Sequence, residues 1–321
     1  MCGDICVFVE TLRGQVTDIT YVMLAAGRVL AKGLNAKLTA VLFGSGIGKL
    51  VDKLGAADRV MTLDHPALVE FNPDAYLAGI AGVLAEHKPR VMLFGHTAMG
   101  TDLACGVAQR LSLPLATSCR TFTVDGADAK FAALTCGGKL IAEGTLPGPS
   151  CIATVMPGGY KADDGKVAKA PPAEALAAPA GLDVARTKFA EYIEPPAGDV
   201  DIAKENVVVS VGRGIQNQDN IALADRLAKA LGGVVAGSRP VIDQAWLPTS
   251  RLVGKSGKQV KPKLYLAVGI SGAPEHLEGV PEADTMIAIN TDANAPIFDV
   301  AHFGTTCDAL KLMPMLAEKI K

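Results

Sequence analysis

GSRPVIDQAWLPTSRLVGKSGKQVKPKLYLAVGISGAPEHLEGVPEADTMIAIN, residues 237–290, reads as buried strands that end in loops rich in glycine and serine. The run Leu264–Val268 is apolar at every position, which is typical of a central strand in a parallel sheet. The loops lie at residues 237–239, 254–257 and 269–272. Open α/β sheets bind nucleotides at the carboxyl ends of their strands, and glycine lets backbone N–H groups approach phosphates closely.

A histidine follows the last of these loops. His276 comes four residues after GISG, in what we expect to be the first turn of the next helix. Helix N-termini attract anions. The stretch therefore predicts a site for phosphates and for a ligand that becomes more negative in use, and a reducible flavin nucleotide fits that description.

Several sequence blocks in the second half of the chain resemble one known family. In order they are GRG at 212–214, GSR at 237–239, VGKSG at 253–257, LYLAVGISG at 264–272 followed by His276, IAIN at 287–290 and APIF at 295–298. This order resembles the alpha subunit of electron transfer flavoproteins. The resemblance is close from Asn206 to the end of the sequence and looser before it.

The resemblance implies a fold and a function. The fold would be α/β, with two domains that each contain a mainly parallel, doubly wound sheet, the C-terminal one a Rossmann-like domain that binds FAD. The protein would form a heterodimer with a beta subunit. It would act as an electron carrier, not a substrate-transforming enzyme, between a flavoprotein dehydrogenase of acyl-CoA or amine type and a quinone oxidoreductase or other acceptor.

Two alternatives stay open beside this interpretation. The chain could be a subunit of an NADH-dependent electron-bifurcating flavoprotein complex, which a second FAD site in the beta subunit would favour. It could also be a nucleotide-binding module without a redox role. A visible flavin spectrum would exclude that last alternative.

The resemblance further implies which residues contact FAD. They are Arg213, Ser238, Arg239, Val253, Gly254, Lys255, Ser256, Ser271, Gly272, Ala273, Pro274, Glu275, His276, Asn290, Asp308 and Ala309. Reduction places negative charge on the N1/O2 edge of the flavin, so Arg239 and His276 would stabilise the reduced forms. The Ser256 hydroxyl would face N5 and O4 of the flavin, and Ser271 would hold the pyrophosphate. Asn290 and Asp308 would reach the adenosine end.

The sequence itself predicts one local conformation at this site. Arg239 precedes Pro240, which biases Arg239 towards an extended conformation beyond the end of a strand.

The chain departs from the family pattern at some of these positions. Lys255 and Glu275 stand where relatives usually carry glutamine, Pro274 where they carry isoleucine, and Ala309 where they carry leucine. Ser256 replaces the commoner threonine and keeps the hydroxyl. Lys255 and Glu275 could face each other as an ion pair beside the cofactor, or each could point to solvent, and the sequence leaves both possibilities open.

The first half of the chain alternates between strand and helix patterns. We predict strands at Ile5–Val9, Leu38–Phe43, Arg59–Leu63 and Arg90–Phe94, and helices at Asp18–Lys32, Lys49–Leu54, Asn72–Glu86 and Thr101–Leu111. This alternation favours βαβ units and a parallel sheet. Over residues 116–155 the apolar period shortens towards two, which predicts antiparallel strands or hairpins.

A domain boundary is expected where the apolar periodicity fades. We predict an N-terminal α/β domain at 1–185 that forms the beta-subunit interface, a connector at 186–202, and the FAD-binding domain at 203–321. The last of these would open with a strand at Asn206–Val211 and a helix at Asn220–Leu231.

Composition argues against several classes of function. With a net charge of −2 and 5% aromatic residues, the chain lacks the basic excess and the stacking platform of a nucleic-acid-binding protein. No uninterrupted apolar run is long enough to span a bilayer. The first ten residues, MCGDICVFVE, are acidic where a signal peptide is basic, so we predict a soluble, cytoplasmic protein.

Other candidate ligand-binding residues are weaker. Residues 44–49, GSGIGK, match neither GxGxxG nor a P-loop, and we interpret them as a tight turn from strand to helix. His65, His96 and His302 have no second ligand nearby in the sequence, so we predict surface or hydrogen-bonding histidines and no metal site. The cysteines are not spaced as a cluster motif, which predicts reduced thiols.

Overall fold

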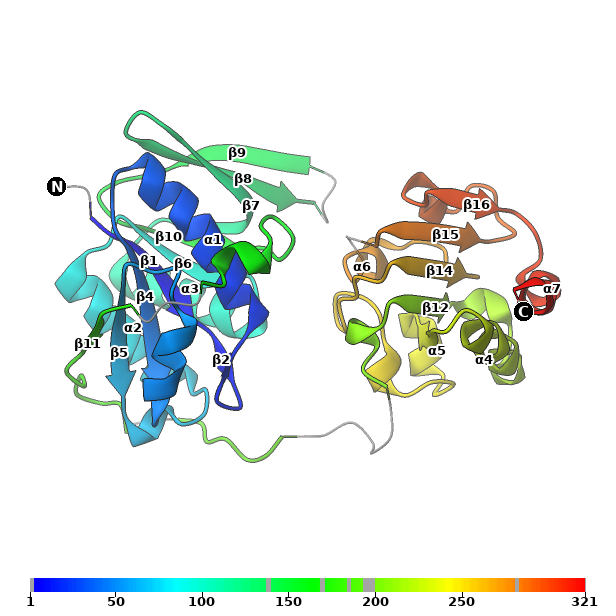
Figure 1. Cartoon of the computed structure of the whole chain (residues 1–321), viewed down its shortest axis with the longest axis horizontal. Helices are drawn as coiled ribbons and strands as arrows, with labels where there is room; N and C mark the ends of the chain where they lie inside the picture. The colour runs from blue at the N-terminus through cyan, green and yellow to red at the C-terminus, as the bar shows by residue number, and fades with distance from the viewer. Residues whose placement is uncertain are drawn as a thin grey trace. The chain divides into compact units, whose positions relative to one another are not determined.

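The structure is a computed structural model that describes residues 3–136, 140–167, 171–183, 186–192, 200–280 and 283–320. The chain divides into two compact units, Met1–Glu191 and Tyr192–Lys321 (Figure 1). This division falls inside the predicted connector. Residues 193–199 of that connector lie outside the described residues, so the connector itself stays a prediction.

A nine-stranded sheet forms the centre of the N-terminal unit, in the order β11-β5-β4-β1-β6-β10-β7-β8-β9 among the described residues. Strand β1 (Ile5–Val9) lies between β4 (Leu38–Gly44) and β6 (Val91–Gly95) and is parallel to both. The other strands are β5 (Arg59–Asp64), β7 (Leu115–Asp125), β8 (Asp128–Thr135), β9 (Leu140–Leu146), β10 (Cys151–Val155) and β11 (Ala173–Ala175). A separate short hairpin pairs β2 (Thr11–Leu12) with β3 (Gln15–Val16). The strands predicted in the first half are confirmed to within one residue at each end.

The antiparallel extension predicted over residues 116–155 is confirmed for part of that stretch. Strands β7, β8 and β9 pair antiparallel, but β10 is parallel to both β6 and β7. Every residue of β10 is buried, as expected of a central parallel strand, and the strand lacks the alternating burial of a hairpin with one face in solvent.

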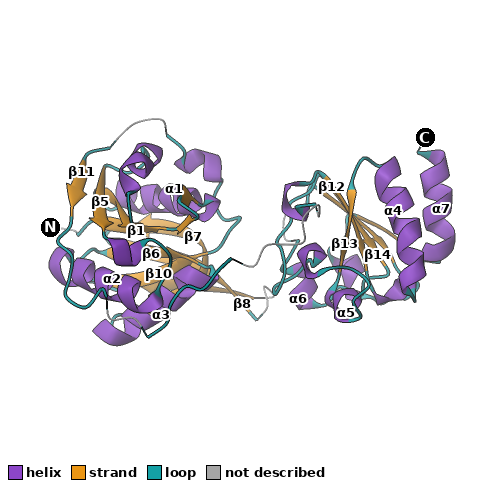
Figure 2. Cartoon of the chain, turned by 90° about the horizontal axis from the view of Figure 1, so that it is seen from below, coloured by secondary structure: helices purple, strands orange, loops and turns teal. Residues whose placement is uncertain are grey.

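Helices cover both faces of this sheet, as a doubly wound fold requires. Ile5, Val7 and Val9 of β1 point into one core cluster, while Cys6 and Phe8 point into another. Helix α1 (Asp18–Gly33) packs on the first cluster, and helices α2 (Pro73–His87) and α3 (Ala98–Leu111) pack on the second (Figure 2).

Two predicted helices differ from those observed. The region predicted as a helix at Lys49–Leu54 is the 3₁₀ helix η1 (Ile47–Lys53). Helix α3 begins three residues before the predicted Thr101. The Thr97 hydroxyl accepts the N–H of Gly100 at 2.9 Å and so caps the helix at an earlier position.

The glycine-rich loop at residues 44–49 is a strand-to-helix turn, as predicted. The Asp64 carboxylate accepts the N–H of Gly46 at 2.9 Å and that of Ile47 at 3.3 Å. The Asp64 carboxylate therefore occupies the N–H groups that a bound phosphate would need, which argues against a phosphate-binding loop. Gly46 has a positive φ of 68°, which explains a glycine at that position.

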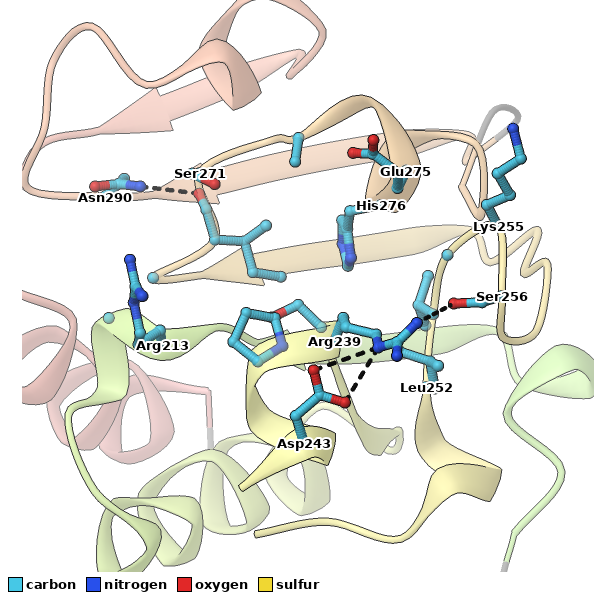
Figure 3. A pocket seen from close by; sticks show the side chains of 18 residues that line it. Arg213, Arg239, Asp243, Leu252, Lys255, Ser256, Ser271, Glu275, His276 and Asn290 are labelled. Atoms are coloured by element: carbon cyan, nitrogen blue, oxygen red, sulfur yellow. Dashed lines mark hydrogen bonds and ion pairs between the residues drawn. The ribbon is translucent and has the colours of Figure 1, made fainter. Parts of the chain in front are cut away.

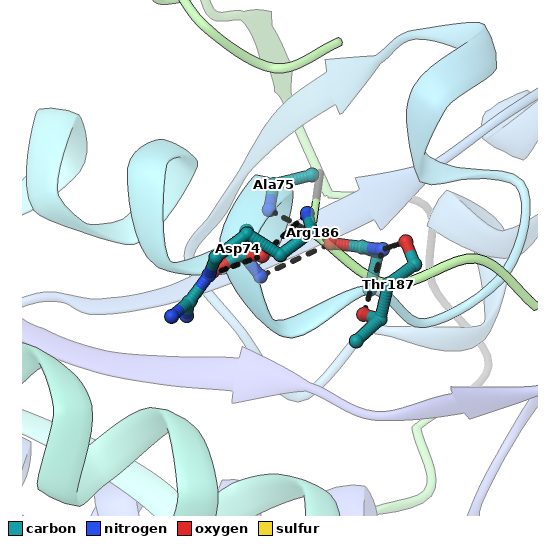
Figure 4. Close-up of polar contacts among 5 residues, drawn as sticks. Asp74, Ala75, Arg186 and Thr187 are labelled. Atoms are coloured by element: carbon teal, nitrogen blue, oxygen red, sulfur yellow. Dashed lines mark hydrogen bonds and ion pairs between the residues drawn. The ribbon is translucent and has the colours of Figure 1, made fainter. Parts of the chain in front are cut away.

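Residues that follow β11 return to the start of helix α2 (Figure 4). Arg186 forms an ion pair with Asp74 at 2.7 Å and donates its backbone N–H to the same carboxylate at 3.0 Å. Asn72 donates to the carbonyl of Thr187 at 2.7 Å. The hydrogen bonds from Arg186 lower the pKa of Asp74. The N-terminal unit thus holds residues up to at least Thr187.

The C-terminal unit contains a five-stranded sheet in which all neighbouring strands are parallel, in the order β13-β12-β14-β15-β16. The strands are β12 (Val207–Val211), β13 (Val234–Gly237), β14 (Leu264–Val268), β15 (Thr285–Ile289) and β16 (Phe303–Thr305). In chain order this is 2-1-3-4-5, the flavodoxin-like variant of the doubly wound sheet and not the six-stranded Rossmann order. The predicted strand at Leu264–Val268 is confirmed at both ends.

Helices α4 (Ile221–Ala230) and α7 (Ala309–Lys319) pack together on one face of this sheet. The predicted helix at Asn220–Leu231 is confirmed to within one residue. Two short helices, α5 (Arg239–Asp243) and α6 (Pro274–Leu277), follow β13 and β14 and bring polar residues to the carboxyl edge of the sheet.

None of the helices in the described ranges combines the length and the apolar character needed to cross a bilayer. The cytoplasmic location is not tested by this finding and stays a prediction.

Candidate functional site

A pocket of about 830 Å³ lies at the carboxyl ends of the strands of the C-terminal unit (Figure 3). The chain runs from β12 to β13 on one side and then returns to β14 on the other, so the strand order reverses between β12 and β14. Open α/β sheets bind ligands at such a switch point. The residues that line the pocket are Arg213, Gly214, Ser238, Arg239, Pro240, Asp243, Leu252, Val253, Gly254, Lys255, Ser256, Gly269, Ile270, Ser271, Ala273, Glu275, His276 and Asn290.

Most of the predicted cofactor-binding residues are brought together there. Gly272, in the loop after β14, and Pro274, the first residue of α6, do not line the pocket. Asp308 and Ala309 lie at the start of α7, where the Asp308 side chain caps the helix by accepting the N–H of Leu310 at 2.9 Å. A direct contact of these four residues with a ligand stays a prediction.

Sequence reasoning missed part of the pocket wall. Gly214 lies within a block that carried the resemblance but was not assigned to the site, and Gly269 and Ile270 were expected to contribute only through the backbone of the GISG loop. Asp243 was also missed, although its position four residues after Arg239 is the spacing of ion pairs on a helix. That spacing is the signal that could have found it.

Arg239 lines the pocket and lies in a polar cluster with Asp243 and Ser256 (Figure 3). Its Nε donates to Asp243 Oδ1 at 3.1 Å, and its Nη1 donates to Ser256 Oγ at 3.3 Å. The extended conformation predicted for Arg239 is wrong, because Arg239 is the first residue of helix α5 and the extended residue is Ser238. Pro240 is compatible with this because a proline in the first helical turn needs no N–H partner.

Glycines allow the loops around the pocket to touch backbone to backbone. Gly214 donates its N–H to the carbonyl of Gly269 at 3.0 Å, and a Cβ on Gly214 would lie 2.6 Å from the Gly269 Cα. Gly254 has φ +146°, and a Cβ there would lie 2.8 Å from the carbonyl oxygen of Glu275. Side chains at these glycines would push apart the loops that form the pocket.

His276 forms a buried part of the pocket wall, with 6% of its surface exposed. Its Nε2 lies 2.8 Å from the hydroxyl of Tyr265, and its Nδ1 has no hydrogen-bond partner among the described residues. Burial lowers the pKa of His276 to about 4, and the backbone of Val253 acts in the opposite direction. The imidazole is therefore neutral at physiological pH.

The neutral state of His276 predicts a loss of stability in acid. The folded pKa lies below the unfolded value, so the contribution is complete above about pH 6.5 and is lost as the pH falls to about 4, at a cost of up to about 3 kcal/mol. His276→Gln should remove this pH dependence. Urea unfolding between pH 4 and 7, followed by the fluorescence of the single tryptophan, Trp246, measures it in the C-terminal unit. Equal pH slopes in the wild type and the variant would contradict the prediction.

Lys255 forms an ion pair with a different carboxylate from the one considered in the sequence. Its Nζ lies 3.4 Å from Glu278 Oε2, while the side chains of Lys255 and Glu275 point away from each other (Figure 3). Lys255 and Glu275 meet through the backbone instead, since the N–H of Lys255 donates to the carbonyl of Glu275 at 2.7 Å. The side-chain partner of Lys255 is therefore Glu278, which lies three residues after Glu275.

The Lys255–Glu278 pair should contribute little to stability. The two side chains are 68% and 32% exposed, and pairs of this kind are worth about 0–1 kcal/mol. In a double-mutant cycle of Lys255→Gln and Glu278→Gln, we expect a coupling energy within that range. Glu275→Gln is the matched control and should show no coupling to Lys255→Gln. A coupling of several kcal/mol at either position would show a buried pair instead.

The N-terminal unit has an equivalent switch point between β1 and β6. The carboxylate of Glu10 occupies it. Glu10 follows β1, is 4% exposed and accepts the hydroxyl of Thr97 at 2.9 Å. Burial raises the pKa of Glu10. A Cβ on Gly100 would lie 2.6 Å from Glu10 Oε1, so the carboxylate sits against the N-terminus of α3. Helix N-termini of this kind bind phosphates in other folds, which favours the C-terminal unit as the ligand-binding one.

The histidines outside the pocket that were considered as ligands make hydrogen bonds, as predicted. His65 Nδ1 accepts the N–H of Ala67 at 3.2 Å, and His302 Nδ1 accepts that of Met286 at 2.9 Å. His96 Nδ1 lies 3.0 Å from the hydroxyl of Thr154.

Both units are similar to families of known proteins. Residues 5–181 match the family described as electron transfer flavoprotein domain, and residues 201–281 match the one described as electron transfer flavoprotein FAD-binding domain. The chain is 36% identical to the electron transfer flavoprotein subunit alpha of Syntrophomonas wolfei, over 98% of both chains. It is 35% identical to the acryloyl-CoA reductase electron transfer subunit beta of Anaerotignum propionicum, over 99% of this chain and 95% of that one. It is 36% identical to the protein FixB of Clostridium saccharobutylicum, over 98% of this chain and 95% of that one.

Proposed function

Because the chain belongs to the family of electron transfer flavoprotein alpha subunits, we propose that its C-terminal unit binds FAD in the pocket between β12 and β14 and carries electrons between partner proteins. The observation that carries this proposal is the position of the pocket. It lies at the switch point of a parallel sheet, and all of its lining residues except Asn290 belong to the part of the chain that matches the FAD-binding domain.

The residues of the pocket fit such a cofactor. Its volume is in the range of ligand pockets, which is about 300–1,000 Å³. Arg213, Arg239 and Lys255 bring positive charge to a ligand that carries two phosphates and becomes more negative on reduction. The Nδ1 atom of His276 is a buried polar atom without a hydrogen-bond partner in the part of the chain that the structure describes, which supports a polar ligand beside it.

We assign the residues to the parts of FAD as follows. The backbone of the loop after β14 and the Ser271 hydroxyl would hold the pyrophosphate, and Arg239, Ser256 and His276 would surround the flavin ring. Asn290 would lie towards the adenosine. Its side chain also donates to the carbonyl of Ile270 at 2.8 Å, so it holds the pyrophosphate loop to the end of β15.

The chemistry of the bound cofactor is the reversible uptake of one or two electrons. The chain would orient the flavin, exclude water from it and set its potential through the charges of Arg239 and Asp243 and the neutral His276. We propose that the protein is an electron carrier and does not itself transform a substrate.

We also propose a heterodimer with an electron transfer flavoprotein beta subunit. Relatives named as alpha and beta electron transfer subunits support a two-subunit assembly. The Glu10 carboxylate occupies the switch point of the N-terminal unit, so we expect that unit to pack against the beta subunit and not to bind a ligand there. Co-expression should give a stable complex that buries well over about 1,000 Å². Size-exclusion chromatography with light scattering measures the assembly. A monomer that carries a full complement of FAD and ignores the beta subunit would contradict the proposal.

The electron donor would be a flavoprotein dehydrogenase of acyl-CoA or amine type, and the acceptor a quinone oxidoreductase or another oxidant. The relative named as an electron transfer subunit of acryloyl-CoA reductase favours a second candidate. In that candidate the chain is a subunit of a larger, NADH-dependent complex that bifurcates electrons. A second FAD in the beta subunit would distinguish it from the simple carrier.

The experiment that tests the proposed function is the absorption spectrum of the purified complex, followed by release of the cofactor and its identification by mass spectrometry. We expect stoichiometric FAD. Gly254→Val, which would drive a side chain into the Glu275 backbone, should abolish its retention, while Gly48→Ala, where a Cβ meets open space, should not. A colourless wild-type complex that does not take up added FAD would rule out the proposed function.

A further inference from the structure

Two buried side chains with polar groups meet at the wall of the pocket. Tyr265 on β14 has no exposed surface, and His276, which lines the pocket, is 6% exposed. The rings of Tyr265 and His276 are 6.1 Å apart, with the tyrosine hydroxyl 2.8 Å from His276 Nε2. A buried tyrosine on a central strand needs a partner for its hydroxyl. Here the partner is a residue of the ligand pocket.

The donor in this hydrogen bond can be assigned from the states of the two groups. Burial raises the pKa of Tyr265 far above its ordinary value, so the phenol keeps its proton and can donate it. Burial also keeps His276 neutral, so only one of its ring nitrogens carries a proton. An arrangement with the proton on Nδ1 lets the Tyr265 hydroxyl donate to the lone pair of Nε2.

The surroundings of Nδ1 are compatible with the same assignment. Nε2 is turned towards the Tyr265 hydroxyl, whereas Nδ1 is buried and makes no hydrogen bond among the described residues. A buried polar atom that the surrounding residues leave without a partner points to a ligand as its partner. Because His276 lines the pocket, a proton on Nδ1 would be the donor that it offers there.

We propose that Tyr265 is a positioning residue that fixes His276 as the neutral Nδ1–H tautomer, so that Nδ1–H is the donor that His276 offers to the ligand. The ligand's identity as a flavin rests on the proposed function, whereas the tautomer does not. Without the Tyr265 hydroxyl, the proton could move to Nε2 and the ring would present a lone pair where a donor is needed. His276 would then stop stabilising negative charge on the ligand.

The test is nuclear magnetic resonance of the complex with ¹⁵N-labelled histidine, recorded with its cofactor and again after the cofactor has been removed. The couplings of each ring nitrogen to the ring protons show which nitrogen carries the proton. The chain has five histidines, and His276→Gln identifies the signals of His276 by their loss. We expect Nδ1–H in the wild type at pH 7 in both states.

Tyr265→Phe should shift His276 towards the Nε2–H tautomer, because the ring packing is kept and only the hydroxyl is lost. Tyr76→Phe is the matched control. Tyr76 is also a buried tyrosine, but its hydroxyl donates to the carbonyl of Leu68 at 3.1 Å in the N-terminal unit. This variant loses a comparable hydrogen bond and should leave the His276 signals unchanged.

A second measurement uses the bound cofactor. With FAD content unchanged, Tyr265→Phe should lower the oxidised/semiquinone midpoint between pH 5 and 8, and Tyr76→Phe should not.

The outcomes separate this proposal from the proposed function. An Nε2–H tautomer in the wild type would overturn the role of Tyr265 even if the variant fails to fold, and so would an unchanged tautomer in Tyr265→Phe. A complex without flavin that still shows the Nδ1–H tautomer and its dependence on Tyr265 would support the positioning role while the proposed function fails.

Discussion

Replacing Arg239 with alanine should lower the oxidised/semiquinone potential of the bound flavin by roughly 40–130 mV, which corresponds to about 1–3 kcal/mol of lost charge-assisted stabilisation in a one-electron couple. The guanidinium is a cation in the pocket, held in place by Asp243 and Ser256. A cation that stays close to the ring favours the form with the added electron. Redox titration of the complex measures the effect.

Asp243 should act in the opposite direction. Its carboxylate lies 3.1 Å from the Arg239 Nε and offsets part of the positive charge. Asp243→Asn should therefore raise the midpoint, and Arg239→Lys should give a value between those of the wild type and Arg239→Ala, because a lysine keeps the charge but lacks the planar, two-sided hydrogen bonding of arginine.

A matched control exists in the same unit. Arg226 on α4 also pairs with a carboxylate, Glu318, at 3.3 Å, but it does not line the pocket. Arg226→Ala removes the same charge and should leave the midpoint almost unchanged. If Arg239→Ala leaves the midpoint unaltered with FAD bound, or if both variants shift it equally, Arg239 has no specific role at the flavin.

The second large effect is expected at Gly272, in the loop after β14. Its φ is +88°, and a Cβ there would lie 2.6 Å from the Cα of Ile297. Ile297 cannot move freely, since its N–H donates to the carbonyl of Ser271 at 2.9 Å. A left-handed conformation costs an alanine about 1–2 kcal/mol, and overlap in a packed region adds about 1–3 kcal/mol. Gly272→Ala should therefore destabilise the C-terminal unit by roughly 3 kcal/mol.

Gly232→Ala separates the two contributions. Gly232 also has a positive φ, +67°, but a Cβ there meets no atom within 4 Å. It should show only the backbone cost of about 1–2 kcal/mol. Urea unfolding followed by Trp246 fluorescence compares the two variants, and Gly272→Ala should also lose retained FAD because the loop that we assign to the pyrophosphate is displaced. Equal losses of stability in the two variants would show that the contact with Ile297 is not limiting.

Much of the fold was predictable because the burial of a strand or helix determines the order of apolar and polar residues within that same segment. Strands β1 and β14 are apolar at every position, and a strand buried on both faces must be. The helix predicted at Asn220–Leu231 was found because its apolar positions recur with the helical period. Many residues of the pocket were placed through the glycine-containing blocks of the family, since close approach of two backbones at Gly214 or Gly254 leaves no room for another residue.

Whether a strand pairs parallel or antiparallel depends on residues outside the strand itself. Strand β10 lies in a stretch that predicted antiparallel hairpins, yet it joins the parallel part of the sheet. Its apolar run is compatible with either arrangement, and the choice depends on β6 and β7, which lie far away in the sequence.

Side-chain partners were decided only by the tertiary structure. Lys255 pairs with Glu278 and meets Glu275 only through a backbone hydrogen bond between the loop after β13 and helix α6. Tyr265 reaches His276 because a short helix after β14 folds back over the sheet. A sequence pattern determines which face of a strand or helix is buried, but the partner of a side chain depends on the direction of its Cα–Cβ bond and on loop contacts between distant parts of the chain.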